Sequence, residues 1–235
     1  MKSLFVHMRL LFRRIISILS HCYYWFSKSI VIKKTSLFFI RICITPQNHL
    51  YLKNAQIHKS IIREGGCGNK VLIKGEMINS SIDVMGEGNI VMLASSASIH
   101  NTNIIVRGTN CVCDIEQDST IGGARIVCMG KDNKVKFGKG CMLSDNIEIW
   151  ATDSHPIFDK DSNVINESRE ISIGNHVWIG SRVIILKGVH IADESIVGMG
   201  SVVTKDIESH TVNAGNPCRC IKCGIQTWDR NFITV

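Results

Sequence analysis

His155 is the side chain in this 235-residue chain best suited by position to transfer a proton. An imidazole takes and returns a proton near neutral pH because its ordinary pKa is about 6.5. Pro156 follows it and restricts the backbone, and the pair stands where a regular repeat breaks off. Most histidines are structural, but this position makes His155 a candidate catalytic residue. Asp153 could orient it or cap the turn.

A second group of residues recurs at a fixed spacing downstream. Ser181 and Met199 are 18 residues apart, and so are Lys187 and Lys205. Neighbouring β-strands lie about 4.8 Å apart, so each pair should form a ladder if one coil contains 18 residues. The lysine ladder could meet phosphate groups. The other ladder could offer a ligand the backbone N–H groups of Gly180, Ser181, Met199 and Gly200.

The elements that position these residues repeat every six residues from Ile173 to Ile207. An aliphatic residue opens each hexad: Ile173, Ile179, Ile185, Ile191, Val197 and Val203. Neither a helix of period 3.6 nor a strand of period 2 keeps an aliphatic residue at every sixth place. Three short faces per coil then give about 18 residues, and coils must stack to bury their apolar side. The sequence predicts an all-β solenoid.

The repeat is less regular upstream. From about residue 50, Gly68-Asn69, Gly88-Asn89, Asn110 and Asp132-Asn133 each precede a Val by the same offset, at Asn spacings of 20, 21 and 23. We interpret these as imperfect early coils with turn residues at a corner. Clean hexads cover 137–154, and 155–170 break the register as an extruded loop. A loop on a rigid frame is a common carrier of function.

Residues 66–222 resemble the hexapeptide-repeat acyltransferases, most closely the sugar and polysaccharide O-acetyltransferases. The hexads and the string Asp153-Ser154-His155-Pro156-Ile157 carry this resemblance. It implies a left-handed parallel β-helix, assembly as a homotrimer with active sites between subunits, and His155 as general base. It further implies acetyl transfer from acetyl-CoA to a carbohydrate hydroxyl in capsular, lipopolysaccharide or exopolysaccharide biosynthesis.

The resemblance also assigns site residues. Trp178 would assist catalysis, close to His155 on the adjoining coil or on a neighbouring subunit; the alternative is an aromatic residue that packs under the loop. The residues expected to bind acetyl-CoA are Gly180, Ser181, Lys187, Met199, Gly200, Thr204 and Lys205.

The two ends of the chain differ from the repeat. Residues 1–63 contain 11 Lys and Arg and no Asp or Glu, whereas the remainder has 16 basic and 20 acidic residues. Because the basic excess is confined to one segment, it does not indicate nucleic acid. We expect residues 1–48 to form a helical extension that either lies on a membrane surface through 1–45 or caps the solenoid. The solenoid would cover 49–216, and 217–235 would end in a short helix around Trp228 that covers the open end.

The composition leaves several alternatives. Ten scattered cysteines favour reduced thiols and a cytoplasmic protein, with possible peripheral contact at the inner face of the plasma membrane. Cys218, Cys220 and Cys223 lack a fourth ligand for structural zinc, so we interpret them as packing residues and expect no metal. The histidines are not spaced for a zinc-dependent carbonic anhydrase. The remaining alternatives are a non-catalytic scaffold and an N-acetyltransferase acting on an amino sugar.

Overall fold

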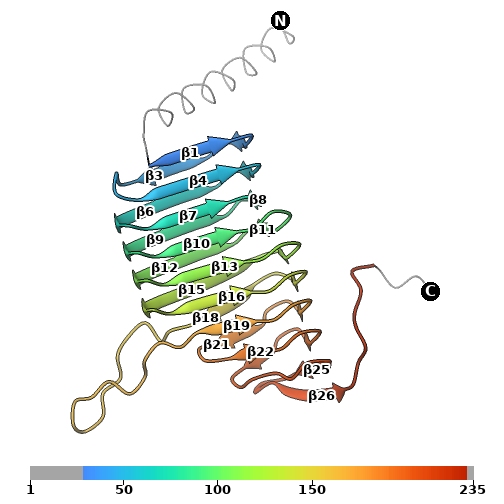
Figure 1. Ribbon diagram of the computed structural model, residues 1–235. Helices are drawn as coiled ribbons and strands as arrows, with labels where there is room; N and C mark the ends of the chain where they lie inside the picture. Colours follow the sequence, from blue (N-terminus) through green and yellow to red (C-terminus); the bar gives the residue numbers. More distant parts are fainter. Residues whose placement is uncertain (1–28, 232–235) are drawn as a thin grey trace, which may run out of the picture.

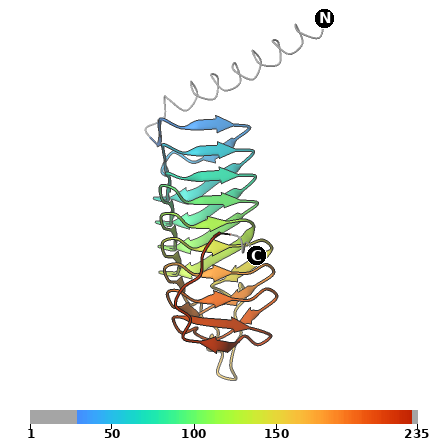
Figure 2. The same ribbon diagram turned by 90° about the vertical axis from the view of Figure 1, so that its right-hand side faces the viewer.

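A computed structural model describes residues 29–231, which form a parallel β-solenoid with three sheets along its sides (Figures 1 and 2). Sheet A contains β1 (Ile30–Lys33), β4 (His49–Lys53), β7 (Lys70–Ile73), β10 (Ile90–Leu93), β13 (Val112–Ile115), β16 (Lys134–Phe137), β19 (Ile171–Ile173) and β22 (His190–Ile191). Sheet B contains β2 (Ser36–Phe38), β5 (Gln56–His58), β8 (Glu76–Ile78), β11 (Ser98–His100), β14 (Thr120–Ile121), β17 (Met142–Leu143), β20 (Trp178–Ile179), β23 (Ile196–Val197), β25 (Thr211–Ala214) and β26 (Arg219–Cys223). Sheet C contains β3 (Arg41–Ile44), β6 (Ile61–Cys67), β9 (Ser81–Glu87), β12 (Asn103–Thr109), β15 (Ala124–Lys131), β18 (Ile147–Trp150), β21 (Ile184–Leu186) and β24 (Val202–Val203). The chain passes from A to B to C in every coil.

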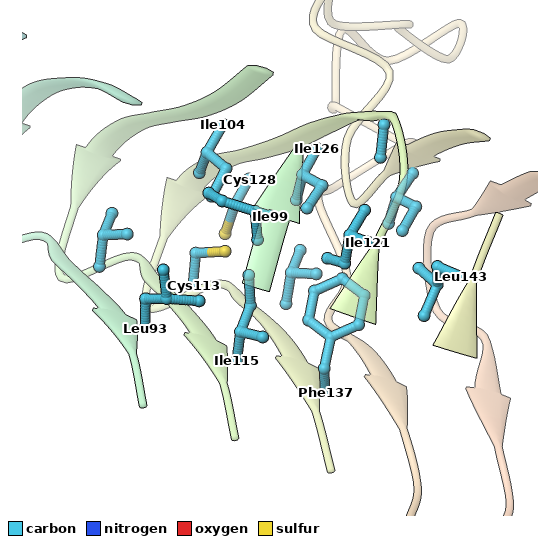
Figure 3. Packing of buried hydrophobic residues seen from close by; sticks show 14 of the residues in the cluster. Leu93, Ile99, Ile104, Cys113, Ile115, Ile121, Ile126, Cys128, Phe137 and Leu143 are labelled. Carbon is cyan, nitrogen blue, oxygen red and sulfur yellow. The ribbon is translucent and has the colours of Figure 1, made fainter. Parts of the chain in front are cut away.

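The hexad aliphatics point into the solenoid, which confirms the predicted all-β architecture. Ile173 pairs with Ile191 and Ile179 with Val197, an 18-residue register. All six hexad-opening residues have exposed fractions of 3% or less. Burying an Ile or Val side chain contributes roughly 1.5–3 kcal/mol, and stacked coils collect this contribution along a continuous core (Figure 3).

The early coils are longer than 18 residues, and their corner is marked by buried asparagines. Asn69 accepts a hydrogen bond through its Oδ1 atom from the amide of Asn89, and Asn89 accepts one from the amide of Cys111. Cys111, not Asn110, therefore occupies the ladder position in its coil, and our alignment of Asn110 with the other asparagines was wrong by one residue. A thiol can replace the amide there because Cys111 is buried against backbone carbonyls.

The boundary of the N-terminal extension also differs from the prediction. Strands β1, β2 and β3 belong to the first coil, so the solenoid begins at Ile30 instead of residue 49. This coil was missed because outward basic and aromatic residues interrupt its apolar pattern. Residues 1–28, which carry most of the predicted extension, lie outside the described residues. The described part, 29–231, is free of helices and so offers no helix that could cross a bilayer.

The C-terminal helix predicted around Trp228 is not formed within the described residues. Strand β26 instead turns back antiparallel to β25, and 224–231 run in an extended conformation along the side of the solenoid (Figure 2). Trp228 is 7% exposed and stacks on His176 with ring centroids 4.1 Å apart. The Arg230 guanidinium donates to the carbonyls of Gly140 and Cys141. The tail covers a corner between sheets A and B because aromatic stacking and exposed carbonyls are available there.

Candidate active site

His155 lies on the loop that leaves the solenoid after β18 and returns at β19, confirming the predicted interruption (the projecting hairpin in Figure 1). Ser154 has a left-handed backbone with φ of 65°, and the His155 amide donates to the Asp153 carbonyl at 2.7 Å. An antiparallel bridge between Phe158 and Val164 holds the two arms of the loop together. This tight turn leaves the His155 side chain exposed at the base of the loop.

Asn166 fastens the two arms of the loop next to His155. Its Nδ2 donates to the His155 carbonyl and to the Asp153 carboxylate, each at 2.9 Å, while its Oδ1 accepts from the Ile157 amide at 2.6 Å. The sequence analysis missed Asn166, because nothing in the irregular loop marks its three contacts. The Asp153 carboxylate therefore orients the loop, and no contact places it on the imidazole of His155 within the described residues.

Lys187 anchors the same loop from the next coil. Its Nζ lies 2.5 Å from Asp153 Oδ2 and donates to the Asn166 carbonyl at 2.9 Å. The hydrogen bond from Lys187, together with that from Asn166, holds the pKa of the Asp153 carboxyl below its ordinary value. The register of β21 and β24 places Lys205 directly below Lys187, as the spacing predicted, and Lys205 is exposed beside Thr204. Of the two lysines, Lys205 is the one not engaged by the loop.

Trp178 lies on sheet B, on the side of the coil opposite the corner that carries His155. Its ring is 38% exposed and its centroid is 5.9 Å from that of Trp228. In one chain the interior of the coil separates Trp178 from His155, so the adjoining-coil contact that we considered is excluded. A contact between neighbouring subunits stays a prediction.

The ladder of Ser181 and Met199 forms the corner between sheets B and C. The Gly180 amide donates to the Val197 carbonyl at 2.8 Å and the Gly200 amide to the Ser181 carbonyl at 2.9 Å. These two amides hold the coils together and are not available to a ligand. Those of Ser181 and Met199 form no such bond within 29–231, and the Met199 side chain is 67% exposed. The ligand-binding role of this corner stays a prediction.

A polar depression that the sequence analysis did not identify lies two coils above this corner. Its volume is about 450 Å³, and its lining includes Asn101, Asn103, Arg125, Asp145 and Glu148. A hydrogen bond with Ser181 is the main cause of the lowered pKa of the Asp145 carboxyl, so the depression connects to the Ser181 ladder. Spacings of 22 to 24 residues between these polar side chains are the signal that could have revealed it.

The cysteines and histidines do not assemble into a metal centre in the described part of the chain, where no three His, Cys, Asp or Glu side chains are grouped to bind an ion. His190 contacts Ser172 on sheet A, while His176 lies at a corner against Trp228. Cys218 is buried, as the packing interpretation requires. Cys220 and Cys223 are exposed, and for them the packing interpretation was wrong.

Known proteins match this geometry and its sequence. A family model described as the hexapeptide repeat of succinyl-transferase matches residues 170–205. The polysialic acid O-acetyltransferase of Neisseria meningitidis is 32% identical, with 53% of this chain aligned to 69% of that protein. The chain belongs to the hexapeptide-repeat O-acetyltransferases. The galactoside O-acetyltransferase of Escherichia coli K12 is 44% identical, but the match covers only 39% of this chain and 45% of the relative.

The family relationship extends to the early coils. A solved structure of a polysialic acid O-acetyltransferase superposes with a TM-score of 0.61 at 25% identity, covering 86% of this chain and 93% of that one. A second, described as a polySia-specific acetyltransferase, gives a TM-score of 0.59 at 27% identity, covering 86% and 90%. The shared β-helix therefore reaches beyond 66–222, the range over which the resemblance was first apparent. The left-handed sense of the coil stays a prediction.

Proposed function

We propose that this member of the O-acetyltransferase family transfers an acetyl group from acetyl-CoA to a hydroxyl of a carbohydrate. The observation that carries the proposal is the exposed His155, held at the base of a loop that Asn166 and Lys187 fasten to the solenoid. The names of the relatives, which describe polysialic acid and galactoside O-acetyltransferases, support the class of acceptor. We expect the acceptor to belong to a cell-surface polysaccharide or its precursor.

His155 acts as general base in this proposal. Its imidazole takes the proton of the acceptor hydroxyl while the hydroxyl oxygen attacks the thioester carbon of acetyl-CoA. The tetrahedral intermediate then collapses and releases the CoA thiol, which receives a proton. General-base catalysis of this kind contributes about 10²–10⁴-fold to the rate, and the fastened loop keeps the imidazole at a fixed place.

The donor site in this proposal uses the amides of Ser181 and Met199 and the side chains of Thr204 and Lys205. Lys205 is exposed and would pair with the CoA phosphates. Lys187 has a different role from the one suggested by its spacing, since its ammonium group already binds Asp153. Its contribution is to hold the loop.

Assembly as a homotrimer completes the proposal. Trp178 is on the face opposite His155, so only another subunit could bring its partly exposed ring near the imidazole. The basic segment 1–28 would place the enzyme at an anionic membrane surface, where surface polysaccharides are assembled. Sedimentation of the full chain, compared with a variant lacking 1–28, on anionic vesicles tests the membrane contact.

Acetyl transfer to sugar and oligosaccharide acceptors, detected as a mass increase, tests the reaction. We expect His155→Ala to lower kcat at least about 100-fold with the thermal midpoint unchanged, because the side chain is exposed. His58→Ala on β5 is the matched control and should retain activity. Undiminished transfer by His155→Ala would refute the general-base role, and failure of acetyl-CoA to raise the melting temperature of the wild type would favour a scaffold.

A further inference from the structure

The last strand, β26, carries two cysteines of the sequence Cys220-Ile221-Lys222-Cys223. In a regular strand, residues three apart point to opposite faces, because side chains alternate. Here β26 pairs with β25 through a bulge: Lys222 lies opposite Val212 and Cys220 opposite Asn213, so Ile221 is the extra residue. The bulge resets the alternation, and both thiols point to one face.

The two sulfurs are the closest pair of thiols in the described part of the chain. Cys220 Sγ and Cys223 Sγ are 2.8 Å apart, and both residues are exposed. Bonded sulfurs are about 2.05 Å apart, so the pair needs to approach by less than about 1 Å to close. The bulge has already oriented the two side chains, and no rearrangement of the solenoid is required.

The other described cysteines do not compete for this pair. Cys218, on the same segment, is 8% exposed and packs against the core. Cys43 is exposed, but it lies on β3 in the first coil, at the far end of the solenoid. The hydrogen bond with Cys220 raises the pKa of the Cys223 thiol, so Cys223 retains its proton and Cys220 is the sulfur better able to react.

We propose that Cys220 and Cys223 are a thiol–disulfide site, which closes to an intramolecular disulfide when the protein meets a small-molecule disulfide such as oxidised glutathione. The Cys220 thiolate attacks one sulfur of the oxidant, forming a mixed disulfide and releasing one glutathione thiolate. The Cys223 thiolate then attacks the Cys220 sulfur and releases the second. Two protein thiols are oxidised, one glutathione disulfide is reduced to two thiols, and two protons are released.

Closure fixes the strand from which the C-terminal tail departs. The tail begins after Cys223 and carries Trp228, which stacks on His176 and lies near Trp178 (Figure 1). The bond forms a small ring across the bulge at the exposed edge of sheet B. Exposed disulfides are the readily reduced ones, so the site should switch with the thiol–disulfide balance around it.

Tryptic mapping of the full-length protein tests this assignment, because trypsin cuts after Arg219 and Lys222. Cys220 then falls in peptide 220–222, Cys223 in 223–230 and Cys218 in 206–219. The folded protein is exposed to oxidised glutathione, its remaining thiols are alkylated at acidic pH, and the digest is analysed by mass spectrometry with and without dithiothreitol.

We expect peptides 220–222 and 223–230 to remain joined until dithiothreitol separates them. Cys220→Ser should abolish the joined species and leave Cys223 alkylated, while Cys218→Ser should retain it. Oxidation in urea is the control for geometry, because an unfolded chain should also join 206–219 to its neighbours. The proposal is overturned if the folded protein leaves both peptides separately alkylated, or if it joins Cys218 to Cys220 as readily as Cys220 to Cys223. Neither result bears on acetyl transfer.

Discussion

Glu64 gives the folded protein a pH dependence that can be worked from its position. It lies on β6 between Ile44 and Val84 of the adjacent coils, points into the solenoid and is 3% exposed. Neither of its carboxyl oxygens has a hydrogen-bond partner among the described residues. Burial raises the pKa of the Glu64 carboxyl from 4.5 to about 8, since an ion is costly in an apolar interior.

The sign of the effect follows from proton binding in the two states. Between pH 4.5 and about 8, folded Glu64 keeps its proton while the unfolded chain releases it. Stability therefore falls as pH rises through this window, at up to about 1.4 kcal/mol per pH unit. From pH 5 to pH 7, Glu64 should lower the free energy of unfolding by about 3 kcal/mol. Below pH 4.5 both states are protonated and the contribution is constant.

Glu64→Gln removes this titration while keeping a similar shape. Urea unfolding at a series of pH values should be followed by far-ultraviolet circular dichroism, because the tryptophans of the described chain lie in later coils. The difference between wild type and variant should change by about 3 kcal/mol between pH 5 and pH 7. Glu87→Gln, at an exposed position on β9, should show no such change. A difference between Glu64→Gln and wild type that stays constant with pH would refute the buried, uncompensated carboxyl.

Three further changes test other parts of the structure. Gly108→Ala should cost at least about 3 kcal/mol, since φ is +121° and an added Cβ would lie 1.9 Å from the Gly130 carbonyl oxygen; Gly224→Ala, with φ of +70° and open space, should cost only about 1 kcal/mol in the same denaturation assay. Lys187→Met should lower kcat about tenfold or more through a displaced loop, whereas Lys205→Met should raise the KM for acetyl-CoA; the opposite pattern in steady-state kinetics would reverse the two roles. Arg230→Ala should release the tail and increase quenching of tryptophan fluorescence by acrylamide, because its guanidinium holds the carbonyl of Cys141 at 2.8 Å; unchanged quenching would contradict this.

The hexads could be predicted from the sequence because each coil repeats the same local demand. An inward aliphatic at every sixth place, from Ile173 to Val203, is sufficient to give the coil length and the stacking of Ser181 on Met199. The early coils were harder to align. Their corner accepts either an amide or a thiol, so Cys111 replaces asparagine without any visible signal. The same tolerance concealed the first coil, which begins at Ile30.

The sequence alone determined the all-β solenoid, the 18-residue ladders and the interruption that presents His155, since each of these follows from spacing along one chain. The tertiary structure decided what those ladders contact. Lys187 meets Asp153 across the loop, and Trp178 lies on the face opposite His155. A bulge, not a spacing rule, brings Cys220 to Cys223. Periodicity specifies a position within a coil, but side-chain partners depend on loops and bulges that bring together residues from different coils.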